Sequence, residues 1–260
     1  MMYDLVLMGG IVVDGTGLAR RRADVGIKDG IVQHIGFIPE SVSAARTMDV
    51  TGMIVAPGIV DLHTHYDPQL TFDPYATSSC YHGVTTVLAG NCGFSLAPTK
   101  ADQRDFIAAM FAKVEGMSPR ALEGVDWAFE SFAEYLEYLQ GRIGVNVACY
   151  VGHSSLRRWV MGAAGSEREA TPDEIQSMRE QLREALQAGA AGFSSSHAPT
   201  QEDGQGRPIP SCFGDLEELK ALVEEAGLWG RGTVSYLPGS VIGGLDQDDS
   251  ELLLQLGELS

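Results

Sequence analysis

The sequence predicts an α/β protein in which a small β-rich domain precedes a parallel sheet wrapped by helices. Short apolar segments separated by turn residues dominate residues 1–56. From residue 57 onwards, β-branched runs alternate with amphipathic helical segments, which is the pattern of βα units with parallel strands. The 260 residues, of which 44% are hydrophobic, can bury a substantial core. We therefore expect two domains, residues 1–56 and residues 57–260.

Five short strands are expected in the first domain, at residues 5–8, 11–13, 25–28, 31–35 and 53–55. The clearest turn signals between them are Asp14-Gly15 and Asp29-Gly30. Asp-Gly pairs favour two-residue hairpin turns because both central residues of such turns take positive φ angles. These features indicate a small β-sandwich-type domain, of which residues 1–56 would form the N-terminal part.

About five βα units are expected in the second domain. Their strands are predicted at residues 59–63, 85–89, 145–151, 191–194 and 233–237. The clearest helix is predicted at residues 172–188, with Thr171 as N-cap, Glu174 as its capping-box partner and Gly189 as the stop. Further helices are predicted at residues 131–140 and 215–226.

Two histidines end the first strand of the second domain, which the apolar run at residues 59–62 predicts to be buried. Side chains alternate faces along a strand, so His63 and His65 should point to the same side. Two imidazoles on one side of a strand end can bind a divalent metal ion. The alternative is a pair of unrelated polar residues at a strand terminus.

A cysteine follows the next strand. The carboxyl ends of consecutive parallel strands lie at the same edge of a sheet, so Cys92 should lie near the histidine pair. A thiolate is a strong zinc ligand. The alternative is that Cys92 is buried as a small apolar residue. The metal interpretation gives a site made of His63, His65 and Cys92.

Motifs in the second domain carry a resemblance to a known family. Pro-Gly-Ile-Val-Asp-Leu-His-Thr-His, at residues 57–65, resembles the first-strand signature of the amidohydrolase superfamily. Gly-Asn-Cys-Gly-Phe-Ser-Leu-Ala-Pro, at residues 90–98, and Val-Gly-His-Ser-Ser-Leu-Arg, at residues 151–157, resemble its D-aminoacylase branch, the N-acyl-D-amino-acid deacylases. The resemblance extends from residue 4 to about residue 226.

The resemblance implies a fold, a cofactor and an activity. The fold is the N-terminal portion of a metal-dependent (β/α)8 TIM-like barrel. One or two zinc ions would be held by His63, His65 and Cys92, with Cys92 in the bridging place that a carboxylated lysine fills in hydantoinase relatives. The implied reaction is hydrolysis of the linear amide bond of a small-molecule N-acyl-D-amino acid.

The chain is expected to carry only part of such a site. A complete (β/α)8 barrel takes about 250 residues, more than residues 57–260 provide. The resembled family also uses histidines from the fifth and sixth strands and a catalytic Asp from the eighth, but the fifth-strand candidate at residues 232–238 contains no His. We therefore expect the general-base Asp to lie beyond residue 260, and this chain alone to be inactive.

The missing strands and site residues leave three hypotheses about the function of the chain. A complete enzyme would obtain its missing C-terminal half from further chain, or cover the gap by self-association. The chain could instead be a truncated or split homologue without catalysis of its own. A cyclic-amide hydrolase of the hydantoinase type is the remaining alternative, but it would need a lysine at the end of the fourth strand, and residues 191–196 contain none.

Five further polar residues are expected to line the substrate pocket or to hydrogen-bond a metal-ligating side chain: His153, Ser195, Ser196, His197 and Asp67. They follow the third strand, the fourth strand and the metal motif, on the barrel edge where catalytic loops lie. For His153, a structural histidine with satisfied hydrogen bonds is the alternative.

The net charge of −17 argues against nucleic acid and anionic membranes as partners, because both bind basic surfaces. No apolar run is long enough for a transmembrane helix, and the N-terminus shows no secretory signal pattern. The four cysteines are widely spaced and form no disulfide framework. A cytoplasmic location is therefore expected.

Overall fold

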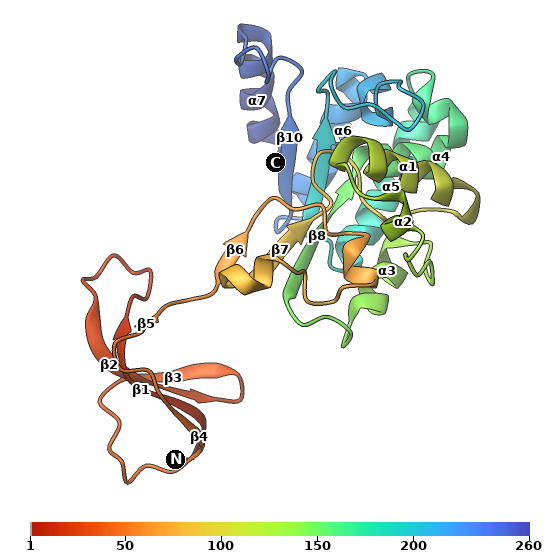
Figure 1. Cartoon of the computed structure of the whole chain (residues 1–260). Coiled ribbons are helices and arrows are strands. Elements are labelled where there is room, and N and C mark those ends of the chain that lie inside the picture. The colour runs from red at the N-terminus through yellow and green to blue at the C-terminus, as the bar shows by residue number, and fades with distance from the viewer. Residues whose placement is uncertain (1) are drawn as a thin grey trace. The chain divides into compact units, whose positions relative to one another are not determined.

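The computed structural model describes residues 2–260. It divides the chain into two compact units, Met1–Ile59 and Val60–Ser260. Figure 1 shows strands alone in the first unit and strands alternating with helices in the second. The second unit is thus α/β, as the sequence predicts.

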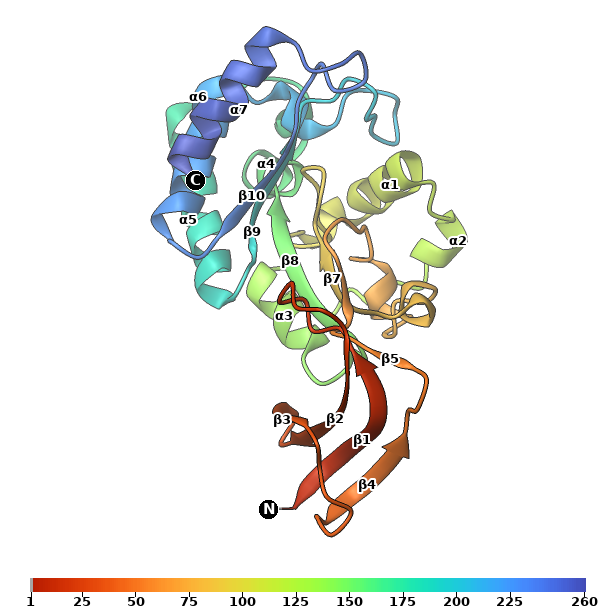
Figure 2. The ribbon, with the colours of Figure 1, turned by 90° about the vertical axis from the view of Figure 1, so that its left-hand side faces the viewer.

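One five-stranded sheet makes up the first unit (Figure 2). Its strands are β1 (Tyr3–Val12), β2 (Arg21–Lys28), β3 (Ile31–Gly36), β4 (Ala44–Asp49) and β5 (Ile54–Val55). The order is β3-β2-β1-β4, with β5 also paired to β1. β2 is antiparallel to β1 and β3, whereas β4 and β5 run parallel to β1. The described residues of this unit form a single sheet, because β4 and β5 extend it instead of starting a facing one.

Two predicted strands of this unit are a single one. Residues 5–8 and residues 11 and 12 of the predicted strand 11–13 fall in β1, whose register against β2 shifts between Leu7 and Gly10. Gly9 takes a φ of 73° at this irregularity. The predicted turn at Asp29-Gly30 is confirmed, since the two residues have φ of 52° and 73° and join antiparallel β2 and β3.

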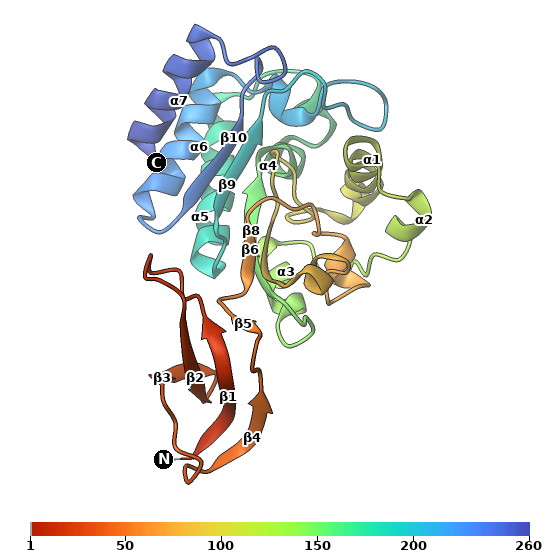
Figure 3. The same cartoon turned by 60° about the vertical axis from the view of Figure 1, so that its left-hand side comes forward.

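The sheet of the second unit has the order β10-β9-β8-β7-β6. Its strands are β6 (Ile59–Asp61), β7 (Val84–Ala89), β8 (Asn146–Gly152), β9 (Gly192–Ser196) and β10 (Thr233–Leu237). The neighbours from β7 to β10 pair in parallel. Strands follow one another in chain order, and the sheet curls as about half of a barrel does (Figure 3).

Helices connect these strands. They are α1 (Arg104–Glu115), α2 (Pro119–Leu122), α3 (Phe132–Leu139), α4 (His153–Met161), α5 (Pro172–Ala188), α6 (Leu216–Leu228) and α7 (Gln247–Leu259), with short 3-10 turns between them. Figure 3 shows α5, α6 and α7 in a row beside β9 and β10. No helix within residues 2–260 has both the length and the apolar character needed to cross a membrane.

Helix α5 spans the residues that its signals predict. The hydroxyl of Thr171 accepts a hydrogen bond from the Glu174 backbone, and the Glu174 carboxylate accepts one from the Thr171 backbone. Gly189 ends the helix with a φ of 117°. Leu182 and Leu186 of this helix are fully buried against the sheet, in a core that also contains Val151 of β8.

Strand β6 differs from the expected buried strand at residues 59–63. It ends at Asp61 and lies at one edge of the sheet. Ile59, Val60 and Leu62 are 55%, 52% and 67% exposed. An edge strand has one neighbour, so its apolar side chains are covered less than those of β7 and β8.

Candidate metal centre

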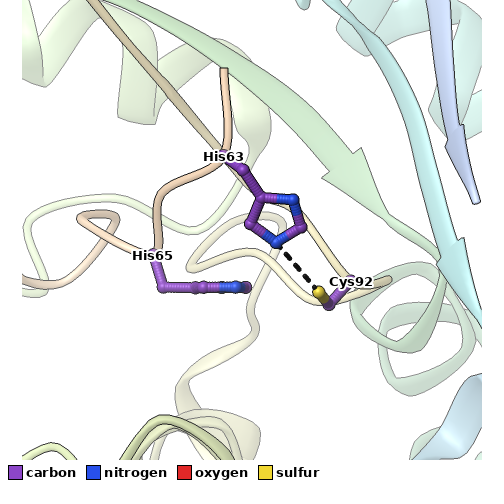
Figure 4. Close-up of side chains that lie close together, drawn as sticks. All are labelled: His63, His65 and Cys92. Carbon is purple, nitrogen blue, oxygen red and sulfur yellow. Dashed lines mark hydrogen bonds between the residues drawn. The ribbon is translucent and has the colours of Figure 1, made fainter. Parts of the chain in front are cut away.

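His63, His65 and Cys92 converge beyond the carboxyl ends of β6 and β7 (Figure 4). Each side chain offers one ligand atom, and these atoms lie within 4.8 Å of one another. His63 Nε2 and Cys92 Sγ are 3.3 Å apart. The structure thus brings together the three residues that the sequence predicts as metal ligands, although the two histidines follow β6 instead of extending it.

A sharp turn after β7 places Cys92. Cys92 itself takes a φ of 54°, between Gly90 at 75° and Gly93 at 77°. A Cβ on Gly90 would lie 2.3 Å from the carbonyl oxygen of Tyr150, so no larger residue fits there without a shift of the backbone. The turn therefore depends on glycine both for its φ angles and for its contact with β8.

Asn91 ties this turn to the segment that carries the histidines. Its side-chain amide donates to the carbonyl oxygens of Leu88, at 2.8 Å, and Thr64, at 3.2 Å. The Thr64 backbone and hydroxyl in turn donate to the Leu88 carbonyl. Because Thr64 lies between His63 and His65, these bonds fix the histidine segment relative to Cys92.

Asp67 supports the same turn and does not line the pocket of the histidines. Its carboxylate is fully buried and accepts hydrogen bonds from the backbone of Gly90, at 3.0 Å, and Leu96, at 3.4 Å. Burial raises the pKa of Asp67 to about 6, although these backbone hydrogen bonds lower it. The Asp67 carboxylate therefore faces the backbone of the Cys92 loop instead of the pocket lined by the histidines.

Burial keeps His65 neutral. It lowers the pKa of His65 to about 4, with His63 contributing through charge repulsion. The ring stacks on Phe94, with centroids 5.1 Å apart and planes inclined by 16°. His65 Nδ1 is buried and has no hydrogen-bond partner among the described residues. A neutral imidazole with a free nitrogen is the form that binds metal.

The Cys92 thiol is uncharged at neutral pH as well, because it keeps its proton. Burial raises its pKa to about 11, the hydrogen bond with the Gln201 side chain lowers it, and the charge of Glu115 raises it. Two imidazoles and one thiol form a donor set typical of zinc. The unpartnered His65 nitrogen and the clustered donors therefore fit a divalent zinc ion.

Sequence reasoning missed two residues at this site. Glu115, the last residue of α1, places Oε1 3.5 Å from His65 Nε2, and burial raises its pKa to about 7. Gln201 reaches the Cys92 thiol from the loop after β9. Neither belongs to a motif, and each lies far along the chain from its neighbour, so only the fold reveals them. A pocket of about 240 Å³ is lined by Asp61, His63, Thr64, His65, Tyr66, Glu115 and Met117.

Comparison with known proteins identifies the family. A model described as the amidohydrolase family matches residues 46–227, which include His63, His65 and Cys92. The chain belongs to this amidohydrolase family. The resemblance to D-aminoacylases is confirmed as well, because relatives of that kind match this amidohydrolase in sequence and in structure.

Three relatives illustrate the match. D-aminoacylase from Alcaligenes xylosoxydans xylosoxydans is 40% identical over 196 residues, which are 74% of this amidohydrolase and 37% of that protein. N-acyl-D-glutamate deacylase from Bordetella bronchiseptica, solved with zinc and a phosphonate mimic of the tetrahedral intermediate, covers 99% of the chain at 31% identity with a TM-score of 0.79. A D-aminoacylase studied for its binuclear metal center covers 99% at 33% identity with a TM-score of 0.76.

The chain spans less than half the length of these relatives. It corresponds to 37% of the Alcaligenes D-aminoacylase and to 49% of each of the two solved structures. The hydantoinases that share the fold are more distant, with 21% identity and a TM-score of 0.55 for an L-hydantoinase from Arthrobacter aurescens.

In this amidohydrolase, His153 and Ser195 belong to a separate buried cluster. His153 Nδ1 lies 2.8 Å from Ser195 Oγ, and His153 Nε2 lies 2.5 Å from Glu218 Oε1. Arg157 forms an ion pair with Glu218. All four side chains are fully buried, so the serine hydroxyl is closed to substrate despite its resemblance to a nucleophilic triad. The arrangement matches the structural alternative for His153.

Ser196 and His197 also lie outside the ligand cluster. Ser196 is fully buried, and its hydroxyl accepts a hydrogen bond from the Ala198 backbone at 3.2 Å. His197 Nδ1 lies 3.0 Å from the hydroxyl of Tyr236 on β10. Burial lowers the pKa of His197 to about 4, so the ring is neutral. The structure therefore does not bring these two residues to His63, His65 and Cys92.

Proposed function

We propose that this amidohydrolase supplies the metal centre of a hydrolase that cleaves the linear amide bond of N-acyl-D-amino acids. The observation that carries the proposal is the convergence of His63, His65 and Cys92 within 4.8 Å. Relatives named D-aminoacylase, N-acyl-D-glutamate deacylase and N-acyl-D-aspartate deacylase support the substrate class. The reaction consumes water and releases a carboxylic acid and an amino acid.

His63, His65 and Cys92 would hold one or two zinc ions. Bound zinc activates water and polarises the carbonyl of a scissile amide. The neighbouring residues keep the donors in place: Asn91 fixes the turn that carries Cys92, and Phe94 packs on the His65 ring. The general-base Asp that the D-aminoacylase resemblance implies is proposed to come from outside residues 2–260.

A cyclic-amide hydrolase is disfavoured by the end of β9. Strand β9 reads Gly-Phe-Ser-Ser-Ser and offers no lysine for carboxylation. Cys92, beside His63, would supply the alternative anionic donor, because a thiol loses its proton when it binds a metal ion. The linear-amide proposal therefore accounts for the residues present, whereas the cyclic-amide alternative needs one that is absent from this strand.

Metal analysis tests the ligand assignment. Cys92→Ala should sharply reduce bound zinc per chain, because it removes the only sulfur of the donor set. Cys80→Ala is the matched control, since Cys80 is a free cysteine that is not part of the ligand cluster. We expect the control to keep its zinc; an unchanged zinc content in Cys92→Ala would exclude Cys92 as a ligand.

Activity is tested by release of the amino acid from N-acyl-D-amino acids with added zinc. We propose that residues 1–260 alone show negligible turnover, because β10 reads Thr-Val-Ser-Tyr-Leu and carries no histidine. Robust turnover that disappears in His63→Ala would show that these residues suffice for catalysis. The relevant comparison is therefore the wild-type chain against His63→Ala under the same zinc concentration.

A further inference from the structure

We propose that Ser194 is a positioning residue of the metal centre, whose hydroxyl holds the turn at residues 90–93 so that the Cys92 thiol faces the two histidines. Ser194 lies on β9 and bonds the backbone of this turn, so it acts on the site through Cys92. The inference rests on the proposed function, because it requires Cys92 to bind the metal ion.

The turn holds Cys92 in a backbone conformation that a residue with a side chain rarely adopts. Cys92 has a φ of 54°, and Gly90 and Gly93 have φ of 75° and 77°. Glycine tolerates this left-handed region, whereas a Cβ crowds the backbone there. Such a conformation persists when the surrounding structure determines it. The position of the thiol therefore depends on the groups that hold the turn from outside.

The Ser194 hydroxyl bonds both ends of the turn. It accepts a hydrogen bond from the Gly93 backbone N–H at 3.1 Å and donates one to the carbonyl oxygen of Gly90. A serine hydroxyl is one of the few small groups that can donate and accept at the same time. Ser194 is fully buried, so removal of its hydroxyl takes a partner from two buried backbone groups.

Other contacts anchor each end of the turn separately. The Gly90 backbone N–H donates to the Asp67 carboxylate at 3.0 Å. The Gly93 carbonyl oxygen accepts from the Ser154 backbone at 2.7 Å. These bonds fix one end each, whereas Ser194 connects the two ends to each other and to β9. It therefore controls how far apart the ends lie, and with that the direction of the side chain between them.

The Cys92 thiol leaves little room for a change in this direction. Figure 4 shows it pointing at His63, with Sγ 3.3 Å from Nε2. Only 7% of Cys92 is exposed. A zinc–sulfur bond is about 2.3 Å long, so a small displacement of the sulfur weakens it. Residues that orient metal ligands in this way affect metal affinity although they do not touch the ion.

Zinc titration of the 260-residue chain against a competing chelator tests the proposal. Ser194→Ala removes both bonds to the turn and should lower zinc affinity by about 10–100-fold. Ser196→Ala is the matched control, because Ser196 is equally buried on the same strand but its hydroxyl accepts from the Ala198 backbone at 3.2 Å. The control should keep wild-type affinity.

Two readouts on the metal-free chain separate positioning from a general loss of structure. Thermal unfolding should shift by similar amounts in Ser194→Ala and Ser196→Ala, because each loses a buried hydroxyl. Alkylation of Cys92 by iodoacetamide, followed by peptide mass spectrometry, should become several-fold faster in Ser194→Ala alone. Cys80, a free cysteine outside the ligand cluster, is the reference within each chain and should react at an unchanged rate.

The outcomes distinguish this inference from the proposed function. An unchanged zinc affinity or an unchanged Cys92 alkylation rate in Ser194→Ala would overturn the role of Ser194 and leave the proposed function standing. Equal losses of zinc affinity in Ser194→Ala and Ser196→Ala would overturn it too, because they would indicate general destabilisation. A wild-type chain that binds no zinc would overturn the proposed function and this inference with it.

Discussion

Single side chains of this amidohydrolase separate into two polar groups with different roles. His63, His65 and Cys92 cluster together; the two histidines line a pocket, and Cys92 is the most buried of the three. His153 and Glu218 instead lie fully buried in an ion-pair network with Arg157. Burial separates the two groups. Metal-binding side chains must be reachable by an ion, whereas the polar atoms of a fully buried network must find their hydrogen-bond partners within the protein.

Removing the charge of Glu218 should destabilise the second unit. Glu218→Gln leaves the buried Arg157 guanidinium without its anionic partner, and breaking a buried pair in this way costs about 3–5 kcal/mol. Urea unfolding followed by circular dichroism measures the free energy of unfolding. Glu217→Gln, an exposed change on the same helix, is the control and should shift it little. Equal stability of the two variants would contradict the role assigned to Glu218.

The same carboxylate should make stability depend on acid. Burial alone would raise the pKa of Glu218, but the hydrogen bond and charge of His153 and the charge of Arg157 overcome it and lower the pKa from 4.5 to about 2. A group with a depressed folded pKa stabilises the fold above its unfolded pKa and loses this contribution as pH falls. Unfolding free energy should therefore fall between pH 4.5 and about 2. Glu218→Gln should show a shallower fall; superimposable pH profiles would argue against it.

The clustering of His63, His65 and Cys92 could be predicted because their spacing follows strand geometry and a shared sheet edge. The roles of His153, Ser195 and Asp67 could not, since sequence places them on the functional edge but does not reveal that their side chains turn inward. The proximity of Glu115 to His65 could not be predicted from sequence either, because it depends on how α1 packs in the fold.

Elements with strong local signals form where the sequence predicts them. Helix α5 matches its prediction at both ends because a capping box and a left-handed glycine mark them. Strand β4 was missed, since its residues Ala-Ala-Arg-Thr-Met-Asp lack an apolar run and its order comes from pairing with β1. Strand β1 was divided in two because adjacent glycines interrupt its pattern. In both cases pairing with a strand distant in sequence makes the strand continuous, and the local sequence pattern does not show this pairing.

The cap of α5 should have a measurable effect. Thr171→Ala removes the hydroxyl that accepts from the Glu174 backbone, which should lower the free energy of unfolding by about 1 kcal/mol. Ser177→Ala, inside the same helix, should be neutral or stabilising because alanine is the better helix former. Chemical denaturation compares the two. A larger loss in Ser177→Ala than in Thr171→Ala would refute the capping assignment.

The second unit as a whole is an open sheet. Its order leaves β6 and β10 at the two edges within the described residues, and it resembles about half of the barrel of its structural neighbours. Ile59, Val60 and Leu62 are exposed at or beside the β6 edge. Exposed apolar strand edges promote association between chains.

The isolated chain should therefore self-associate as its concentration rises. Val60→Lys places a charge on the exposed edge and should shift the equilibrium towards monomer, as measured by sedimentation velocity. Val32→Lys is the control, because Val32 is similarly exposed, at 53% against 52% for Val60, but lies on β3 of the first unit. A wild-type chain that stays monomeric at every concentration would disprove this expectation.

The turn that carries Cys92 bears on when the donor cluster can form during synthesis of the chain. His63 and Cys92 are only 29 positions apart, and the bonds from Asn91 and Thr64 that connect their segments all lie within the same short stretch. The cluster of donors thus has a low contact order and can assemble soon after this stretch leaves the ribosome. Glu115 and Gln201 join it later in synthesis. We therefore expect the cluster of donors to form before the rest of the second unit has been synthesised, early enough for the proposed metal ion to bind during translation.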